Sequence, residues 1–515
     1  MHRALQIQEI LSIIFGHLCP SRVREDARDL AALARTCCAF KGPALDVLWT
    51  EFYCDLSALA RCLPEACHRS YSRPSVFYYA IKSYNFYRSL TQNEWDILRS
   101  YTRRIRSLII EDDILGIGWD SLISLLKPPT GEPLFSNLRR LHFQYTTVTR
   151  RLLLLPLPSL ESLSIQLNDQ RSVEGSLKSF AEISPSLREL NIRPRYYRKI
   201  DMDRIDPTFI CHWRNLHSVL CFQIPLDVLT LVYLSRMPAL TSLGFRLRSN
   251  LPDEISPSDS PLIFSNLKRL VSSSELLDPI SQLLSQIRLP VVMEVSLSVE
   301  SRPSRQDLSS FLTGVQTSGN LHIIQALSLD QPHHFDRTYP PADKPVLGLE
   351  DLQPFMTFSN LRCICLDIEW KVDLADSELL TLVSTWPHLE ALLINAVWGW
   401  NTQGGITPNG LLQLLQTCPS LTAIALVVDT RGYTDIPPLP ANLGLTWPRL
   451  SDIDVLDSFI EEKSVPAIAA FFAGLAPSSK FRFRYWDSGR MPRMNQDIYK
   501  YHWTYVFEQI KVAIH

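Results

Sequence analysis

The sequence contains no apolar run long enough to cross a lipid bilayer. A membrane-spanning helix needs about 20 consecutive apolar residues, whereas the richest run here covers only residues 152–157. The stretch 10–18 is apolar, but Gln6, Gln8 and Glu9 precede it and no small-residue cleavage site follows it. We therefore expect neither a signal peptide nor a membrane partner.

Neither sign of charge is in excess. The chain has 51 Lys and Arg against 53 Asp and Glu, which gives a formal net charge of −2. General nucleic-acid binders carry a clear basic surplus, so we expect no nucleic-acid partner. Residues 193–199 mix basic and aromatic side chains as RNA contacts do, but we favour a solvated insertion for this stretch.

Catalytic and cofactor-binding motifs are also missing. We find no hydrolase elbow, phosphate loop, zinc-protease helix or dinucleotide fingerprint, and we therefore predict no cofactor and no enzymatic activity. The 11 cysteines have no regular spacing, which indicates reduced thiols in a cytoplasmic or nuclear protein. Cys54, Cys62, Cys67 and His68 are close in sequence, but their spacing matches no standard zinc site, so we predict no metal centre.

The sequence does contain a degenerate repeat. The phrase Pro-x-Leu-x-x-apolar-x-apolar, clearest at residues 419–426, returns along most of the chain at intervals of 22 to 37 residues. Self-similarity at such a period indicates a solenoid, in which each unit buries its apolar face against its neighbours. The first apolar residues of the thirteen copies are Ile105, Leu138, Leu160, Leu187, Leu216, Leu240, Leu267, Val292, Ile324, Leu361, Leu389, Leu421 and Leu450.

Each copy predicts a short strand followed by a helix. Apolar residues alternate with exposed ones at the end of the phrase, which is the period of a strand, and helix-like stretches such as 407–415 lie between copies. This unit resembles the leucine-rich repeat. The resemblance implies an α/β solenoid, an irregular arc of about 13 strand–helix repeats. Asn168 and Asn395 are the nearest candidates for the asparagine that follows the strand in regular repeats, so we expect no continuous asparagine ladder.

The first 52 residues do not fit the repeat. Apolar residues recur there with helical spacing, and the stretch predicts three short helices. It resembles the F-box family, with Gln6 and Ile7 in place of the usual Leu-Pro. Such a domain implies binding to a Skp-type adaptor through residues that contact it or hold the domain together. The matching residues are Glu9, Ile10, Leu11, Ile14, Phe15, Leu18, Leu30, Leu33, Cys37, Phe40, Leu48 and Trp49.

Four regions follow from these patterns. We predict a three-helix F-box-like domain at 1–52, an aromatic-rich linker at 53–100, a repeat solenoid at 101–479 and a C-terminal cap at 480–515. Thr91 and Glu94 have the spacing of a capping box at the start of a helix in the linker. An alternative for 1–52 is a helical cap that only shields the first repeat, since solenoids need capped ends.

The residues between the inward apolar positions of each strand should face outward, on the concave side. In the predicted register this face is basic in the early repeats and acidic in the later ones, which would suit a partner of complementary charge. Ordinary surface charge is the simpler explanation. The residues we assign to target binding are Arg140, His142, Arg193, Arg246, Arg269, Asp330, Asp367, Asp452 and Asp454.

The resemblances together imply the substrate-recognition subunit of an SCF-type ubiquitin ligase. The F-box would bind the Skp adaptor and, through it, a cullin–RING ligase, and the repeats would bind a target protein whose identity the sequence does not give. A repeat scaffold unconnected with ubiquitin is the alternative, because fold analogy alone does not name a function.

Overall fold

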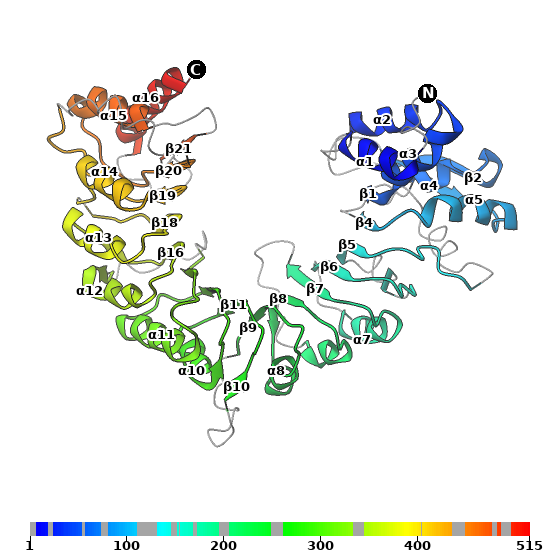
Figure 1. The fold of residues 1–515 in the computed structure, drawn as a ribbon, viewed down its shortest axis with the longest axis horizontal. Coiled ribbons are helices and arrows are strands. Elements are labelled where there is room, and N and C mark those ends of the chain that lie inside the picture. The colour runs from blue at the N-terminus through cyan, green and yellow to red at the C-terminus, as the bar shows by residue number, and fades with distance from the viewer. Residues whose placement is uncertain are drawn as a thin grey trace. The chain divides into compact units, whose positions relative to one another are not determined.

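The computed structural model describes residues 7–18, 24–53, 57–73, 81–110, 131–145, 152–153, 155–167, 173–194, 205–248, 261–332, 344–402, 404–434, 449–475, 481–485 and 496–514. The chain forms two compact units, Met1–Pro225 and Leu226–His515. Both consist mainly of parallel strands with helices along one side of them (Figure 1). No helix in the described ranges is long and apolar enough to cross a membrane.

The first unit begins with three helices, as the sequence predicts. A parallel sheet follows them directly, in the order β1-β4-β5-β6-β7-β8. The helices are α1 (Gln8–His17), α2 (Arg24–Leu33), α3 (Cys38–Thr50) and, between β6 and β7, α7 (Val173–Ile183). The strands are β1 (Glu51–Tyr53), β4 (Ser107–Ile110), β5 (Arg140–Tyr145), β6 (Ser162–Leu167), β7 (Glu189–Pro194) and β8 (Ser218–Pro225).

A small insertion separates β1 from β4. It contains α4 (Ser57–Arg61), an antiparallel hairpin of β2 (His68–Arg73) with β3 (Ile81–Phe86), and α5 (Gln92–Thr102). The capping box at the start of α5 is confirmed, because the Glu94 carboxylate accepts a hydrogen bond of 2.7 Å from the backbone N–H of Thr91. Arg88 adds two hydrogen bonds to the same carboxylate, at 2.8 and 2.9 Å.

The Glu94 carboxylate should make stability depend on pH. Its hydrogen bonds from Arg88, and then that from Thr91, lower the pKa of Glu94 to about 2. An acid with a lowered pKa stabilises the fold above its ordinary pKa and loses that contribution as pH falls towards the lowered value. We expect Glu94→Gln to lower the urea midpoint at pH 7. The difference in urea midpoint between wild type and variant should narrow as pH falls from about 4.5 towards 2. A difference that does not depend on pH would contradict this.

The second unit continues the strand–helix alternation. Its large sheet is parallel and has the order β9-β11-β13-β14-β16-β18-β19-β20-β21. The strands are β9 (Ser242–Arg246), β11 (Arg269–Ser274), β13 (Glu294–Val299), β14 (Ala326–Asp330), β16 (Cys363–Asp367), β18 (Ala391–Ile394), β19 (Ala423–Ala425), β20 (Asp452–Asp454) and β21 (Arg482–Arg484). The helices are α8 (Val228–Ser235), α10 (Asp278–Gln286), α11 (Arg305–Ser318), α12 (Leu349–Leu352), α13 (Asp376–Val383), α14 (Pro408–Thr417), α15 (Val465–Leu475) and α16 (Gln496–Ile514).

Two short parallel pairs lie outside that sheet. They are β10 (Leu262–Ile263) with β12 (Ile287–Arg288), and β15 (Val346–Leu347) with β17 (Lys371–Val372). At the C-terminal end, β21 and α16 follow the repeats and close the unit. The Trp503 indole of α16 is buried against Phe483 and donates a hydrogen bond of 2.8 Å to the Ser458 carbonyl. Both elements lie within the range 480–515, for which the sequence predicts a C-terminal cap.

The repeat leucines form the core of both units. All thirteen first apolar residues of the repeat phrase are at most 2% exposed. In strands such as β6 and β13, burial alternates strictly with the sequence, because successive side chains of a strand point to opposite faces. The predicted repeat and its register are therefore confirmed, and the chain is an α/β solenoid.

Candidate functional site

The three N-terminal helices enclose a small core of their own. Leu11 and Phe15 of α1 are buried with Leu30 of α2 and Ala44 of α3. Around them pack the partly buried Leu33, Ala34, Phe40, Val47 and Leu48. The rings of Phe15 and Phe40 meet edge to face, with centroids 5.5 Å apart. Six of the twelve residues that match the F-box pattern therefore hold this three-helix module together.

Trp49 connects this module to the first repeat. It is buried, and its ring stacks on Phe52 of β1 at 5.3 Å and lies 4.8 Å from the ring of Tyr101 in α5. Arg104 adds an ion pair to Asp46 of α3. The sequence assigned Trp49 to the F-box-like domain, and the structure gives it the role of anchoring that domain to the solenoid.

A second apolar surface of α1 faces solvent. Ile14 and Leu18 are 41% and 42% exposed, Ile7 before the helix is 46% exposed, and Ile10 is half-buried. These four residues follow one another at steps of three or four, so they line one side of the helix. Glu9 is also exposed. We call Ile7, Ile10, Ile14 and Leu18 the α1 stripe.

The outward side of the strands in the first unit has the predicted residues. Arg140 and His142 of β5 and Arg193 of β7 alternate with buried neighbours. Arg140 makes an ion pair of 2.8 Å with Glu51. Arg193 donates a hydrogen bond of 2.9 Å to Asn191 and lies 5.9 Å from the ring centre of Phe222. These positive charges are exposed but already have partners.

The two predicted arginines of the second unit are also paired. Arg269 lies 2.9 Å from Glu294 on the adjacent strand β13, and Arg246 lies 3.7 Å from Glu300. The sequence analysis did not use these glutamates. Glu294 lies on the strand next to that of Arg269, whereas Glu300 follows β13, two strands away from that of Arg246. Both pairings therefore depend on the strand register.

The acidic end of the predicted surface needs correction. Asp367, Asp452 and Asp454 are only 5–6% exposed. Arg482 and Arg484 of β21 lie 3.0 and 3.2 Å from Asp452 and cover it. Asp330 is half-buried, accepts a hydrogen bond of 2.9 Å from Ser298, and has its pKa raised by burial. The later repeats thus use their aspartates inside the fold and do not present an acidic face.

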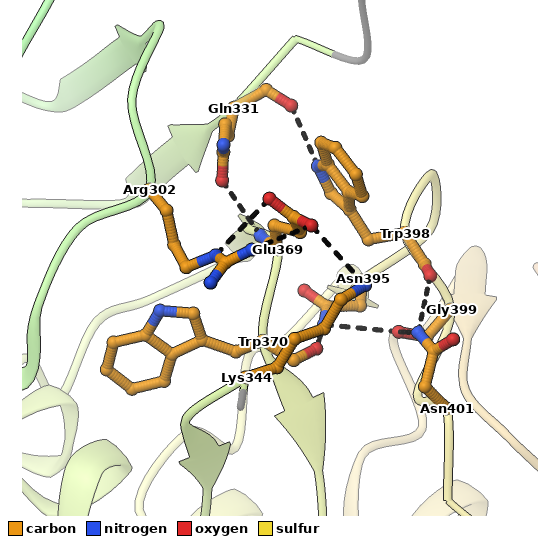
Figure 2. Close-up of polar contacts among 9 residues, drawn as sticks. All are labelled: Arg302, Gln331, Lys344, Glu369, Trp370, Asn395, Trp398, Gly399 and Asn401. Atoms are coloured by element: carbon orange, nitrogen blue, oxygen red, sulfur yellow. Dashed lines mark hydrogen bonds and ion pairs between the residues drawn. The ribbon is translucent and has the colours of Figure 1, made fainter. Parts of the chain in front are cut away.

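Asn395, directly after β18, performs the structural role of a repeat asparagine. It is fully buried, and its backbone is left-handed with φ 53°. Its side-chain oxygen accepts from the Ile368 N–H at 3.0 Å. Its amide donates to the carbonyls of Trp370 at 2.8 Å and Gly399 at 3.2 Å (Figure 2). Asn168 lies outside the described residues. The side chain of Gln331 acts similarly after β14, since it accepts from the Glu369 N–H at 2.9 Å.

A buried carboxylate organises the same strand ends. Glu369 is 4% exposed and pairs with Arg302 at 2.9 Å and with Lys344 at 3.5 Å (Figure 2). Lys344 also lies 5.8 Å from the ring centre of Trp398, whose indole donates to the Gln331 carbonyl at 2.8 Å. The cluster has a partner for each of these charges, so it holds the loops after β14, β16 and β18 together.

The thiols of β16 are not poised for chemistry. Burial raises the pKa of Cys365 to about 12 and also raises that of Cys363, and only a thiolate is an effective nucleophile. In the part of the chain that the structure describes, no three His, Cys, Asp or Glu side chains gather as a metal site would need. Cys54 and the pair His333-His334 lie outside that part.

Comparisons with known proteins add little to this geometry. No family model matches the chain, and no curated protein matches it either. Among solved structures, an internalin from Listeria monocytogenes has 14% identity and a TM-score of 0.33 over 76% of this chain and 89% of its own. A chain of the yeast Rad7 and Elc1 complex also has 14% identity and a TM-score of 0.33, over 72% of this chain and 75% of its own.

The fold conclusion therefore comes from the chain itself. Parallel strands at a repeat of 22 to 37 residues, the buried leucine phrase and the buried asparagine after β18 are features of one architecture. The protein has a leucine-rich-repeat-like α/β solenoid, preceded by a three-helix module with an exposed apolar stripe.

Proposed function

We propose that this protein is the substrate receptor of an SCF-type ubiquitin ligase. The three-helix module binds a Skp-type adaptor, and the adaptor connects the protein to the cullin–RING ligase. The repeats hold a target protein. The receptor performs no chemistry of its own, because it acts by raising the effective concentration of the target near the ubiquitin-loading site. This function places the protein in the cytoplasm or nucleus.

The α1 stripe is the observation that carries this proposal. A helix that only caps a solenoid needs one apolar face, and Leu11 and Phe15 already provide it. The α1 stripe adds a second apolar surface, on which Ile7, Ile14 and Leu18 are 41–46% exposed. Exposed apolar residues gathered on one helix side indicate a protein–protein interface, and the F-box resemblance names the partner as the adaptor.

Charge substitution in the α1 stripe should abolish adaptor binding and leave the fold intact. We expect Ile14→Asp combined with Leu18→Asp to weaken binding by about 30-fold for each residue changed, since apolar anchors at an interface contribute about 2 kcal/mol each. The full chain is co-expressed with a Skp-type adaptor, and the affinity of the purified proteins is measured by calorimetry. Thermal unfolding checks that each variant is folded.

A matched control is available in the second unit. Leu229 is 71% exposed, so Leu229→Asp makes the same kind of change away from α1 and should retain wild-type adaptor affinity. Wild-type protein that binds no adaptor, or a double variant that binds as well as wild type, would reject the receptor function. Either result would favour the second candidate, a repeat scaffold whose N-terminal helices serve only as a cap.

A further inference from the structure

Helix α16 has two apolar sides, and only one of them is buried. The helix packs beside α15 at the C-terminal end of the second unit (Figure 1). Its inner side is at most 2% exposed and consists of Trp503, Val506 and Ile510. On the outer side, Tyr501, Tyr505 and Val512 are 74%, 47% and 73% exposed. The last helix of the unit therefore presents large side chains to solvent.

The outward residues of α16 form one continuous line. Positions 501, 505, 508 and 512 follow at steps of four, three and four residues, which is the spacing of the a and d positions of a coiled coil. We call Tyr501, Tyr505, Glu508 and Val512 the α16 stripe. The terminal cap of a solenoid normally has a polar outer face, which keeps it soluble. Tyrosine is instead enriched at protein–protein interfaces, so the α16 stripe has the composition of a contact surface.

The α16 stripe is complementary to itself when a second copy of the helix runs antiparallel to it. With a two-fold axis between residues 506 and 507, Tyr501 faces Val512 of the other copy and Tyr505 faces its Glu508. Each contact then occurs twice, as symmetry requires in a dimer formed by the same surface of both copies. The two apolar layers lie at the ends, and the two polar layers lie at the centre.

Glu508 decides the relative direction of the two helices. In a parallel pair the two Glu508 carboxylates would face each other and repel. In the antiparallel pair each carboxylate can accept a hydrogen bond from a Tyr505 hydroxyl. Lys511 donates to Oε1 of Glu508 at 2.9 Å and lies 4.2 Å from the ring centre of Phe507. This holds the carboxylate beside the stripe, and its other oxygen is the acceptor for the tyrosine.

We propose that this protein forms a homodimer through the α16 stripe, with the two helices antiparallel. A whole aromatic side chain buries about 150–250 Å², so the exposed parts of Tyr501 and Tyr505 offer roughly 250 Å² in each copy. Stable complexes bury about 1,200–2,000 Å² in total. The dimer is therefore weak and reversible, with a dissociation constant in the micromolar range. It needs only the second unit and does not depend on an adaptor.

The test is sedimentation equilibrium of the purified full chain without any adaptor. Concentrations run from about 1 to 100 µM, because a dimer forms by mass action. We expect the average mass to rise with concentration from that of one copy towards that of two. A chain that keeps the mass of one copy throughout would overturn the proposal.

Single variants locate the contact. Tyr501→Asp should raise the dissociation constant by about 30-fold or more, since one substitution disrupts two symmetric contacts. Tyr505→Phe keeps the ring and loses only the hydroxyl, so it should raise the dissociation constant about fivefold. Tyr87→Asp is the matched control, because Tyr87 is 60% exposed in the first unit, and it should dimerise like wild type. Thermal unfolding verifies that all variants are folded.

A double variant tests the antiparallel arrangement. Val512→Lys alone should weaken the dimer, whereas Val512→Lys combined with Tyr501→Asp in the same chain should restore part of it. The antiparallel pair places the introduced carboxylate opposite the introduced ammonium group of the other copy, and a parallel pair would place like charges together. Damage to the fold would add up and not cancel. A double variant that recovers no dimer would overturn the antiparallel contact.

The α1-stripe variant separates this dimer from adaptor binding. Ile14→Asp with Leu18→Asp should dimerise like wild type. A dimer that is lost in that variant, or that survives Tyr501→Asp unchanged, would place the contact elsewhere and overturn the proposal. Since no adaptor is present, a chain that stays monomeric leaves adaptor binding by the α1 stripe untouched. Loss of adaptor binding likewise leaves the dimer standing.

Discussion

Asn395→Ala is expected to lower the free energy of unfolding of the second unit by about 4 kcal/mol. The change removes three buried hydrogen bonds and leaves the Ile368 N–H and the carbonyls of Trp370 and Gly399 without their partner. Each buried polar group left unpaired costs about 1–3 kcal/mol. Alanine also has no local hydrogen bond to offset the left-handed backbone at φ 53°, which costs about 1 kcal/mol.

Urea denaturation of the full chain, with hydrogen exchange to localise the loss, measures this effect. Asn395→Gly separates the backbone cost from the cost of the lost hydrogen bonds, because glycine relieves the backbone cost and leaves the polar groups unpaired. Asn360→Ala is the matched control, since Asn360 is exposed and donates one hydrogen bond to His322. It should cost less than about 1 kcal/mol. Equal losses for Asn395 and Asn360 would show that the asparagine after β18 does not organise the strand ends.

Phe15→Ala is expected to destabilise the three-helix module by about 3–5 kcal/mol. Phe15 is 3% exposed and packs edge to face on Phe40, and removing a buried aromatic ring leaves a cavity that a small module cannot fill. Hydrogen exchange of the α1–α3 amides should report the loss, and adaptor binding should disappear with it. Ile13→Ala, on the same helix but 63% exposed, should change stability by less than about 0.5 kcal/mol.

Phe15→Ala and the α1-stripe variant separate folding from binding. The former should lose both protection of the amides and adaptor binding, whereas Ile14→Asp with Leu18→Asp should lose only the binding. If Phe15→Ala kept both, the module would not depend on its core, and the match of Phe15 to the F-box pattern would have no structural basis.

The repeat and the cores could be predicted from sequence because they depend on local periodicity. Leucines at the first apolar position of each copy are buried wherever they occur, since a strand with period two can bury only one face. The burial of Leu11 and Phe15 could be predicted in the same way, from apolar residues at helical spacing. For Ile14 and Leu18 the pattern predicts an apolar side chain but not its neighbours, so their exposure appears only in the folded module.

The aspartates of the later repeats are the part that sequence reasoning placed incorrectly. Asp452 has the outward register that was predicted, yet Arg482 and Arg484 from a strand 30 residues later cover it. Glu369 has no local feature that marks it as buried, because its partners Arg302 and Lys344 lie in other repeats. The large apolar residues of α16 lie on two sides of the helix, and only the fold shows which side is buried.

The sequence alone therefore determined the strand–helix repeat, its register and the apolar cores, because burial of apolar side chains is set by periodicity along the chain. The tertiary structure decided which charges pair and which are buried. Those outcomes depend on side chains from separate strands, such as Asp452 and Arg482, that only parallel strand pairing brings side by side. Electrostatic interactions act through space over a few ångströms, so the order of residues along the chain does not fix them.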